Sequence, residues 1–187
     1  MTRIIAGRFR GRRLSVPDGK DVRPTTDRMR ERLFSILGHS RYPAMAGAQV
    51  ADIFAGTGAL GLESLSRGAA HVTFVEKARS SLDCLRSNIA SLDATQATTT
   101  IASDAATVAP TETTFDFIFM DPPYRQGLLR PTLDRLTAGG WIKGGTCIAC
   151  ELAVDEQFDL PPELAIVDDR KHGKQRILIL TQSSPNI

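Results

Sequence analysis

The most constraining feature of this sequence is a strand pattern and a helix pattern that alternate from residue 49 onward. Apolar runs typical of buried strands occur at QVADIF, HVTFVE, TTTIAS and FDFIFM. The run ALGLES predicts one helix after the first strand. A second helix is indicated by apolar residues at steps of four and three, at Ala78, Leu82, Leu85, Ile89 and Leu92. Strands joined by helices pair in parallel, so we expect an α/β fold, with a sheet wrapped by helices on both faces.

The last part of the chain, from about residue 141, keeps strand patterns but has little helix between them. Its apolar runs are ACELAV, LAIVDD and QRILILT. Residues 171–174, which include Gly173, are suited to a hairpin turn between the last two runs. With the four earlier strands, they predict a mostly parallel seven-stranded sheet that ends in an antiparallel hairpin.

Length and composition fit one globular domain, or one domain with a small appendage. The chain has 187 residues, 42% of them hydrophobic, and can bury a core without disulfides or a structural metal. Its three scattered cysteines argue against a disulfide framework and for a reducing, cytoplasmic location. We expect no membrane span, because no uncharged run approaches roughly 18 residues, and no signal peptide, because no apolar stretch follows the basic start.

The amino-terminal fifth of the chain is strongly basic. Residues 1–41 contain 11 Arg and Lys against 4 Asp and Glu, and the rest contains 12 against 17. The runs RIIAGRF and RRLSV predict a small β-hairpin. A helix is expected next, capped by Thr26, with an apolar stripe of Met29, Leu33, Ile36 and Leu37.

Ten of these 11 basic residues are arginine, which is suited to phosphate contact and to stacking on bases. Nucleic acid is therefore the expected partner, and the alternative is a solvated basic arm without a ligand. Arg28, Arg30 and Arg32 are expected to lie off the apolar stripe of the helix. The proposed nucleic-acid-facing residues are Arg8, Arg10, Arg12, Arg13, Arg28, Arg30 and Arg32.

The stretch DIFAGTGALGLE joins a strand to a helix through Gly56 and Gly58. Glycines at such a turn let backbone N–H groups approach a ligand. Glu76 ends the next strand, where an acid can accept hydrogen bonds from ribose hydroxyls, so a nucleoside cofactor is expected. A dinucleotide site and a tight turn without a ligand stay open. Asp52, within the strand, favours a positively charged ligand such as S-adenosylmethionine over phosphates.

The motif DPPY, residues 121–124, follows the apolar strand FDFIFM. It therefore lies at the carboxyl end of a strand, where open α/β sheets bind ligands. The Asp121 carboxylate and the Pro122 carbonyl can accept the two hydrogens of an exocyclic amine, and Tyr124 can stack on a flipped base. A rigid proline turn is the alternative. Combined with the glycine turn, the motif favours methylation of an amino group.

Other polar and sulfur-containing residues carry weaker signals. Asp104 and Ala105 follow the third strand of the pattern, where an acid or the adjacent backbone can contact an adenine. The alternative is a solvated surface acid. Cys147 and Cys150 form a CxxC without a second pair, so we expect core packing rather than a metal or redox site. No metal site is predicted.

Three blocks of this sequence resemble the RsmD family, bacterial 16S ribosomal RNA guanine-N2 methyltransferases. They are RIIAGRFRGRRL, VRPTTDRMRERLFSIL, and the pair DIFAGTGALGLE and DPPY, in the family's order and at similar spacing. The resemblance extends from about Arg3 to the final strand. It implies a Rossmann-like class I methyltransferase domain at residues 23–187, with a basic β-hairpin extension at residues 1–22 that contacts RNA.

The resemblance also implies the activity and the residues that perform it. The expected enzyme uses S-adenosylmethionine to methylate N2 of one guanine in small-subunit rRNA, as a monomer acting on an assembled or assembling 30S particle. Its catalytic residues would be Asp121, Pro122, Pro123 and Tyr124. Cofactor contacts would come from Asp52, Ala55, Gly56, Gly58, Glu76, Asp104, Ala105, Thr25 and Thr26. The loop at residues 106–114 has no assigned role.

Two other functions stay open at this point. An adenine N6 methyltransferase acting on DNA or RNA would use the same motif, because Asp or Asn before PPY serves either base. A non-catalytic RNA-binding assembly factor would keep the arginines and could dispense with DPPY. A dinucleotide oxidoreductase would need a hydride-transfer site, which the sequence does not offer.

Overall fold

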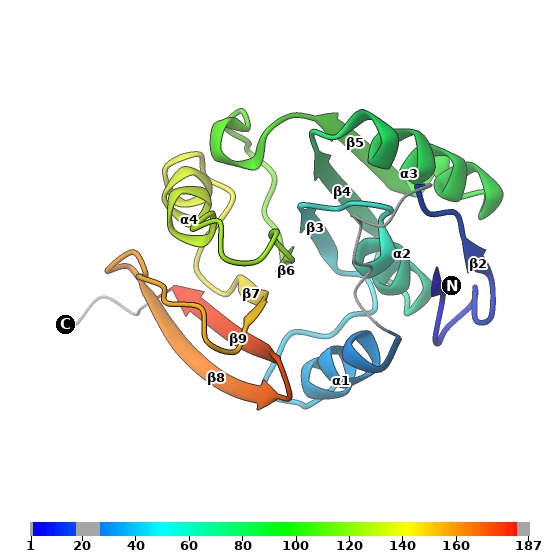
Figure 1. The fold of residues 1–187 in the computed structure, drawn as a ribbon. Coiled ribbons are helices and arrows are strands. Elements are labelled where there is room, and N and C mark those ends of the chain that lie inside the picture. The colour runs from blue at the N-terminus through cyan, green and yellow to red at the C-terminus, as the bar shows by residue number, and fades with distance from the viewer. Residues whose placement is uncertain (1, 18–26, 183–187) are drawn as a thin grey trace.

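A seven-stranded sheet forms the centre of the fold (Figure 1). The computed structural model describes residues 2–17 and 27–182. In spatial order the strands are β5 (Thr98–Ala102), β4 (His71–Glu76), β3 (Gln49–Ile53), β6 (Phe117–Met120), β7 (Cys147–Ala153), β9 (Gln175–Gln182) and β8 (Leu164–His172). The pairs from β5 to β7 are parallel, whereas β9 runs antiparallel to both β7 and β8. The predicted sheet, including its antiparallel hairpin, is confirmed.

Helices cover both faces of the sheet, as expected. They are α1 (Asp27–Leu37), α2 (Ala59–Ser66), α3 (Arg79–Ser91) and α4 (Leu129–Ala138), with short 3-10 turns η1 (Thr95–Ala97) and η2 (Ala105–Thr107). The first three helices share one core with Phe117 and Phe119, and α4 and η2 share a second core with Ile118 and Met120. Alternate residues of β6 therefore face opposite layers. The helix α4 was not predicted from the sequence.

The helices within residues 2–17 and 27–182 are too short or too polar to span a membrane.

Cys147 and Cys150 are buried in β7 and belong to opposite cores, so their expected packing role is confirmed. Burial raises the pKa of the Cys147 thiol to about 12, and raises that of Cys150 as well.

The amino-terminal hairpin is much shorter than the sequence predicts. Its strands β1 (Thr2–Arg3) and β2 (Arg13–Leu14) are antiparallel but contain two residues each. The expected strand through Phe9 is wrong, because the backbone N–H groups of this stretch bind α2 instead. The carboxylate of Glu63 accepts hydrogen bonds from the Ile5 and Ala6 amides at 2.7 and 3.0 Å.

Close packing fixes the same segment against α2 and α3. A Cβ on Gly7, which has a φ of +80°, would lie 1.9 Å from the backbone oxygen of Ser66. The side chain of Asn88 on α3 bonds to both the N–H and the carbonyl of Ser15. Residues 2–15 are therefore attached to the helices of the main sheet by specific hydrogen bonds, which fix the backbone that carries their arginines.

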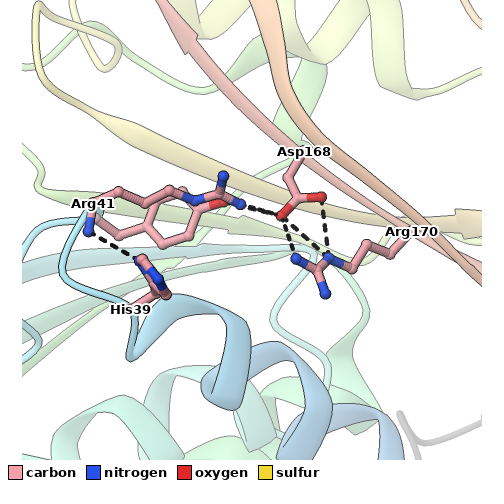
Figure 2. Close-up of polar contacts among 5 residues, drawn as sticks. His39, Arg41, Asp168 and Arg170 are labelled. Atoms are coloured by element: carbon pink, nitrogen blue, oxygen red, sulfur yellow. Dashed lines mark hydrogen bonds and ion pairs between the residues drawn. The ribbon is translucent and has the colours of Figure 1, made fainter.

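A polar cluster joins the α1–β3 connection to the edge strand β8. Figure 2 shows that Arg41 and Arg170 converge on the carboxylate of Asp168. The hydroxyl of Tyr42 donates to the same carboxylate at 3.3 Å. These contacts, of which the hydrogen bond from Arg170 is the largest cause, lower the pKa of Asp168. The cluster ties α1 to the far edge of the sheet.

Candidate functional site

One cavity of about 440 Å³ lies at the carboxyl ends of β3, β4 and β6. The order of the sheet changes direction at β3 and β6, which is where open α/β sheets bind ligands. Nine of the predicted site residues line this cavity: Asp52, Ala55, Gly56, Glu76, Ala105, Asp121, Pro122, Pro123 and Tyr124. The structure thus joins the glycine turn, the strand-end acid and the DPPY motif in one site.

The glycine turn is held by Glu76. Oε2 of Glu76 accepts the Gly56 amide at 2.7 Å, and its Oε1 accepts the amides of Lys77 and Ala78 at 2.8 and 2.7 Å. Gly56 has a φ of +54°, and a Cβ there would meet nothing within 4 Å. The positive φ, rather than crowding, therefore requires glycine at this position. Glu76 both braces the turn and offers a carboxylate to the cavity.

Gly58 has a clear packing role, and its predicted cofactor contact stays a prediction. It does not line the cavity, and its N–H donates to the Ala55 carbonyl at 2.7 Å. A Cβ on Gly58 would lie 2.4 Å from the Cδ1 atom of Leu85, on α3. The missing side chain therefore allows α2 and α3 to pack closely.

Asp52 is a buried acid at the floor of the cavity. It is 1% exposed, and its Oδ2 accepts the Gly61 amide of α2 at 2.8 Å. Burial raises the pKa of Asp52 well above its usual range, and the charges of Asp121 and Glu76 raise it further. A bound cation would relieve this repulsion and favour the ionised acid. The floor of the cavity thus suits a positively charged group.

Asp104 lies beside the cavity rather than in its lining, and its predicted cofactor contact stays a prediction. Its carboxylate accepts the Ala106 amide at 3.0 Å, which caps η2, and pairs with Lys77 at 2.8 Å. The hydrogen bond from Lys77 is the largest cause of its lowered pKa. Ser103 and Ala105 line the cavity instead. Thr25 and Thr26 lie outside the described residues.

The DPPY motif follows β6, and all four of its residues line the cavity. The Tyr124 hydroxyl donates to Oε1 of Glu151 at 2.6 Å, and Nε2 of Gln175 donates to the same oxygen at 2.5 Å. Burial, together with the hydrogen bond to Glu151, raises the pKa of Tyr124. The ring is therefore held by its hydroxyl and is neutral at physiological pH.

Glu151 and Gln175 were not predicted as site residues, although both line the cavity. One signal was available for Glu151: it is the single charged residue in CIACELA, a strand buried along its whole length. Buried carboxylates are costly and are often functional. Gln175, at the start of β9, carries no such signal, because only pairing with β7 brings it to the site.

The predicted arginines divide into an exposed set and one buried residue. The exposed ones are Arg8, Arg10, Arg12, Arg13, Arg28 and Arg32. Arg30 is 0% exposed and bonds to the Arg3 carbonyl and the Asp27 carboxylate, so its predicted RNA-facing role is wrong. It lies beside Met29 on the inner face of α1, where it joins the segment 2–15 to that helix.

The described residues contain no group of three or more His, Cys, Asp or Glu side chains placed to hold a metal ion.

Comparison with known proteins identifies the family. Residues 2–181 match the model of a family described as "Conserved hypothetical protein 95". An Escherichia coli protein named "Ribosomal RNA small subunit methyltransferase D" is 42% identical over 160 residues, which cover 86% of this chain and 79% of that protein. The chain belongs to the RsmD family. The resemblance inferred from the three sequence blocks is confirmed.

Other members of the RsmD family and solved structures agree with this assignment. A Haemophilus influenzae protein of the same name is 31% identical over 175 residues, which cover 91% of this chain and 89% of that protein. The solved structure titled "Putative methyltransferase yhhF from Escherichia coli" has a TM-score of 0.83 and 38% identity, with 96% of this chain and 97% of that chain covered. The methyltransferase fold expected from the sequence is confirmed.

Proposed function

We propose that this protein transfers a methyl group from S-adenosylmethionine to the exocyclic N2 amine of a guanine in small-subunit ribosomal RNA. One observation carries the proposal: a single cavity contains the glycine turn, the strand-end Glu76 and the DPPY motif. The names of the relatives support small-subunit rRNA as the substrate. A monomer in the cytoplasm, acting on an assembled or assembling 30S particle, is part of the same proposal.

The lining of the cavity fits this cofactor. S-adenosylmethionine supplies a methyl group on a positively charged sulfur and carries two ribose hydroxyls. The carboxyl groups of Asp52, Glu76 and Asp121 all line the cavity, and together they favour a positively charged ligand. Glu76 would accept the ribose hydroxyls, and Ala105 with its neighbouring backbone would contact the adenine.

The residues of DPPY would hold the target amine. The Asp121 carboxylate and the Pro122 carbonyl can accept its two hydrogens, which turns the nitrogen lone pair away from the conjugated ring. The Tyr124 ring, fixed by its hydroxyl, offers a stacking surface for the flipped base. No covalent enzyme intermediate is needed, because positioning supplies most of the help for a direct displacement.

Replacing Glu76 with alanine is expected to weaken S-adenosylmethionine binding by roughly 1 to 3 kcal/mol, because two hydroxyls would lose a charged acceptor. The Gly56 amide would lose its acceptor as well. Turnover at saturating cofactor should recover substantially. Calorimetry checks the binding, and Glu112→Ala, in an exposed loop, is the control. Unchanged affinity in the Glu76 variant would show that this acid does not bind the cofactor.

The exposed arginines of the amino-terminal segment are expected to bind RNA phosphates. Replacing Arg10 and Arg13 with alanine should raise the RNA dissociation constant and leave cofactor affinity unchanged. Each lost phosphate contact should flatten the log–log salt dependence by about 0.7 to 0.9. A filter-binding salt series measures this slope, with Arg130→Ala on α4 as control. If the salt dependence of RNA binding is the same for the double variant and the parent, the segment is a solvated basic arm that does not contact RNA.

One experiment tests the function itself. The protein is incubated with methyl-labelled S-adenosylmethionine and naked small-subunit rRNA, assembled 30S subunits or duplex DNA, and the products are digested to nucleosides. Labelled N2-methylguanosine from either RNA sample is the expected result. Labelled N6-methyladenosine would establish the adenine alternative, and no label in any sample would support a binding factor without catalysis.

A further inference from the structure

An arginine directly follows the DPPY motif and has an unusual backbone conformation. Arg125 has a φ of +58°, in the left-handed region that residues other than glycine seldom adopt. The residues on either side of it, Tyr124 and Gln126, line the cavity. Glycine would adopt this φ without strain, so the geometry of the turn alone does not explain an arginine at the rim of the site.

The side chain of Arg125 forms an exposed ion pair with Asp155, which lies two residues after the end of β7. Nη2 of Arg125 donates to Oδ1 and Oδ2 of Asp155 at 2.9 and 3.0 Å. The two side chains are 65% and 63% exposed, and an ion pair in such a position contributes little to stability. Both bonds use one nitrogen, whereas a guanidinium has five N–H donors. Another anion can therefore replace Asp155 at low cost.

The cavity beside this ion pair is acidic. Four carboxyl groups line it, those of Asp52, Glu76, Asp121 and Glu151. Within the described part of the chain, Lys77 is the one basic residue of the lining, and it pairs with Asp104 at 2.8 Å. Carboxylates repel the phosphates of an RNA strand that brings a base to the cavity. A cation at the rim would offset this repulsion.

The amino-terminal arginines are held at the far ends of the helices that line the cavity. The Arg8 amide donates to the Ser66 carbonyl at the end of α2, at 2.9 Å, and the Arg12 guanidinium donates to the Ser91 carbonyl at the end of α3. The opposite end of α2 lines the cavity from Ala59. At about 1.5 Å of rise per residue, Ala59 and Ser66 are about 10 Å apart. Phosphate contacts at that end leave the nucleotide at the cavity to be held by other groups.

We propose that Arg125 releases Asp155 and binds the RNA phosphate next to the flipped guanosine. The inference rests on the proposed function and adds a phosphate contact at the cavity to those of the amino-terminal segment. A flipped base enters a pocket while its own phosphates stay outside, and Tyr124, which would stack on the base, is the neighbour of Arg125 in the chain. The planar guanidinium suits this role, because it can donate to two phosphate oxygens at once.

The variant Arg125→Gly tests the contact, because it removes the guanidinium and suits the positive φ. The probe is whichever of naked small-subunit rRNA and 30S subunits the parent protein methylates. The dissociation constant should rise about fivefold at about 0.1 M salt, and the log–log salt dependence should flatten by about 0.7. Affinity for S-adenosylmethionine should not change. Arg130→Ala is the matched control, since Arg130 also pairs with an aspartate, and it should alter neither quantity.

A second variant separates exchange of partners from a structural role of the ion pair. Asp155→Asn removes the competing carboxylate, so it should lower the RNA dissociation constant about two- to fivefold. The same substitution should have less effect in the Arg125→Gly background, because the two residues would act through one contact. Asp159→Asn, at an exposed position of the same connection, controls for the loss of one negative charge.

The outcomes separate the inference from the function on which it rests. If the parent yields no N2-methylguanosine, the proposed function fails and the inference falls with it. If the parent methylates guanine while Arg125→Gly keeps both the affinity and the salt dependence, the inference alone fails. Equal weakening of RNA binding in Arg125→Gly and Asp155→Asn also overturns it, because the ion pair would then only hold the loop in place.

Discussion

Replacing Asp121 with alanine is expected to reduce methyl transfer by about 100-fold or more, while S-adenosylmethionine binding stays within a few fold. The expected loss is that of removing one positioned acceptor from the transition state. Asp121 follows β6 and lines the cavity together with Pro122 and Tyr124. Turnover and calorimetric binding, measured on the same protein preparation, check both parts of the prediction.

Two further variants make the Asp121 result interpretable. Asp121→Asn keeps one carbonyl acceptor and should lose less activity than the alanine variant. Asp134→Ala, which removes an exposed acid of α4 paired with Arg130, should leave turnover unchanged. Near-normal turnover in Asp121→Ala would remove this carboxylate from the mechanism. A parallel loss of cofactor binding would instead assign it to the cofactor.

The parts of the fold that follow local patterns were predictable from the sequence. Short apolar runs, separated by segments with the apolar periodicity of helices, predicted the sheet. A strand of a parallel sheet is buried on both faces, so its sequence is apolar nearly throughout. The site followed for a similar reason. Gly56, Glu76 and Asp121 each lie at or just beyond the carboxyl end of a strand, and parallel pairing brings those ends to one edge.

The features that the sequence analysis missed depend on tertiary contacts. Gly58 was predicted only as a ligand-binding glycine, whereas its missing side chain also accommodates Leu85 from another helix. Arg30 was placed on the polar side of its helix, although the Arg3 carbonyl and Asp27 stabilise it on the inner face. Gln175 reaches the site only through the antiparallel pairing of β9 with β7. No local pattern encodes such contacts.

The amino-terminal segment is also held by a tertiary contact that no local pattern predicts, the contact of its backbone with Glu63 on α2. Glu63, which is 0% exposed, accepts hydrogen bonds from the Ile5 and Ala6 amides and from Nε of Arg67. Replacing it with alanine leaves these donors without their acceptor. We expect the free energy of unfolding to fall by about 3 to 5 kcal/mol, measured by denaturant titration. The control Glu31→Ala, at an exposed position of α1, should change it by less than about 0.5 kcal/mol.

A substitution of Glu63 should loosen residues 2–15 before it unfolds the rest of the protein, because the two amides that Glu63 binds belong to this segment. Hydrogen exchange of the Ile5 and Ala6 amides should accelerate in Glu63→Gln, because the amide keeps one acceptor oxygen where the carboxylate offered two. The Ser15 amide, held by Asn88, should change less. RNA affinity should fall with the loss of protection, because Arg8 and Arg10 follow directly in the detached stretch. Full protection of both amides in the variant would mean that packing against Ser66, rather than Glu63, holds the arginines in place.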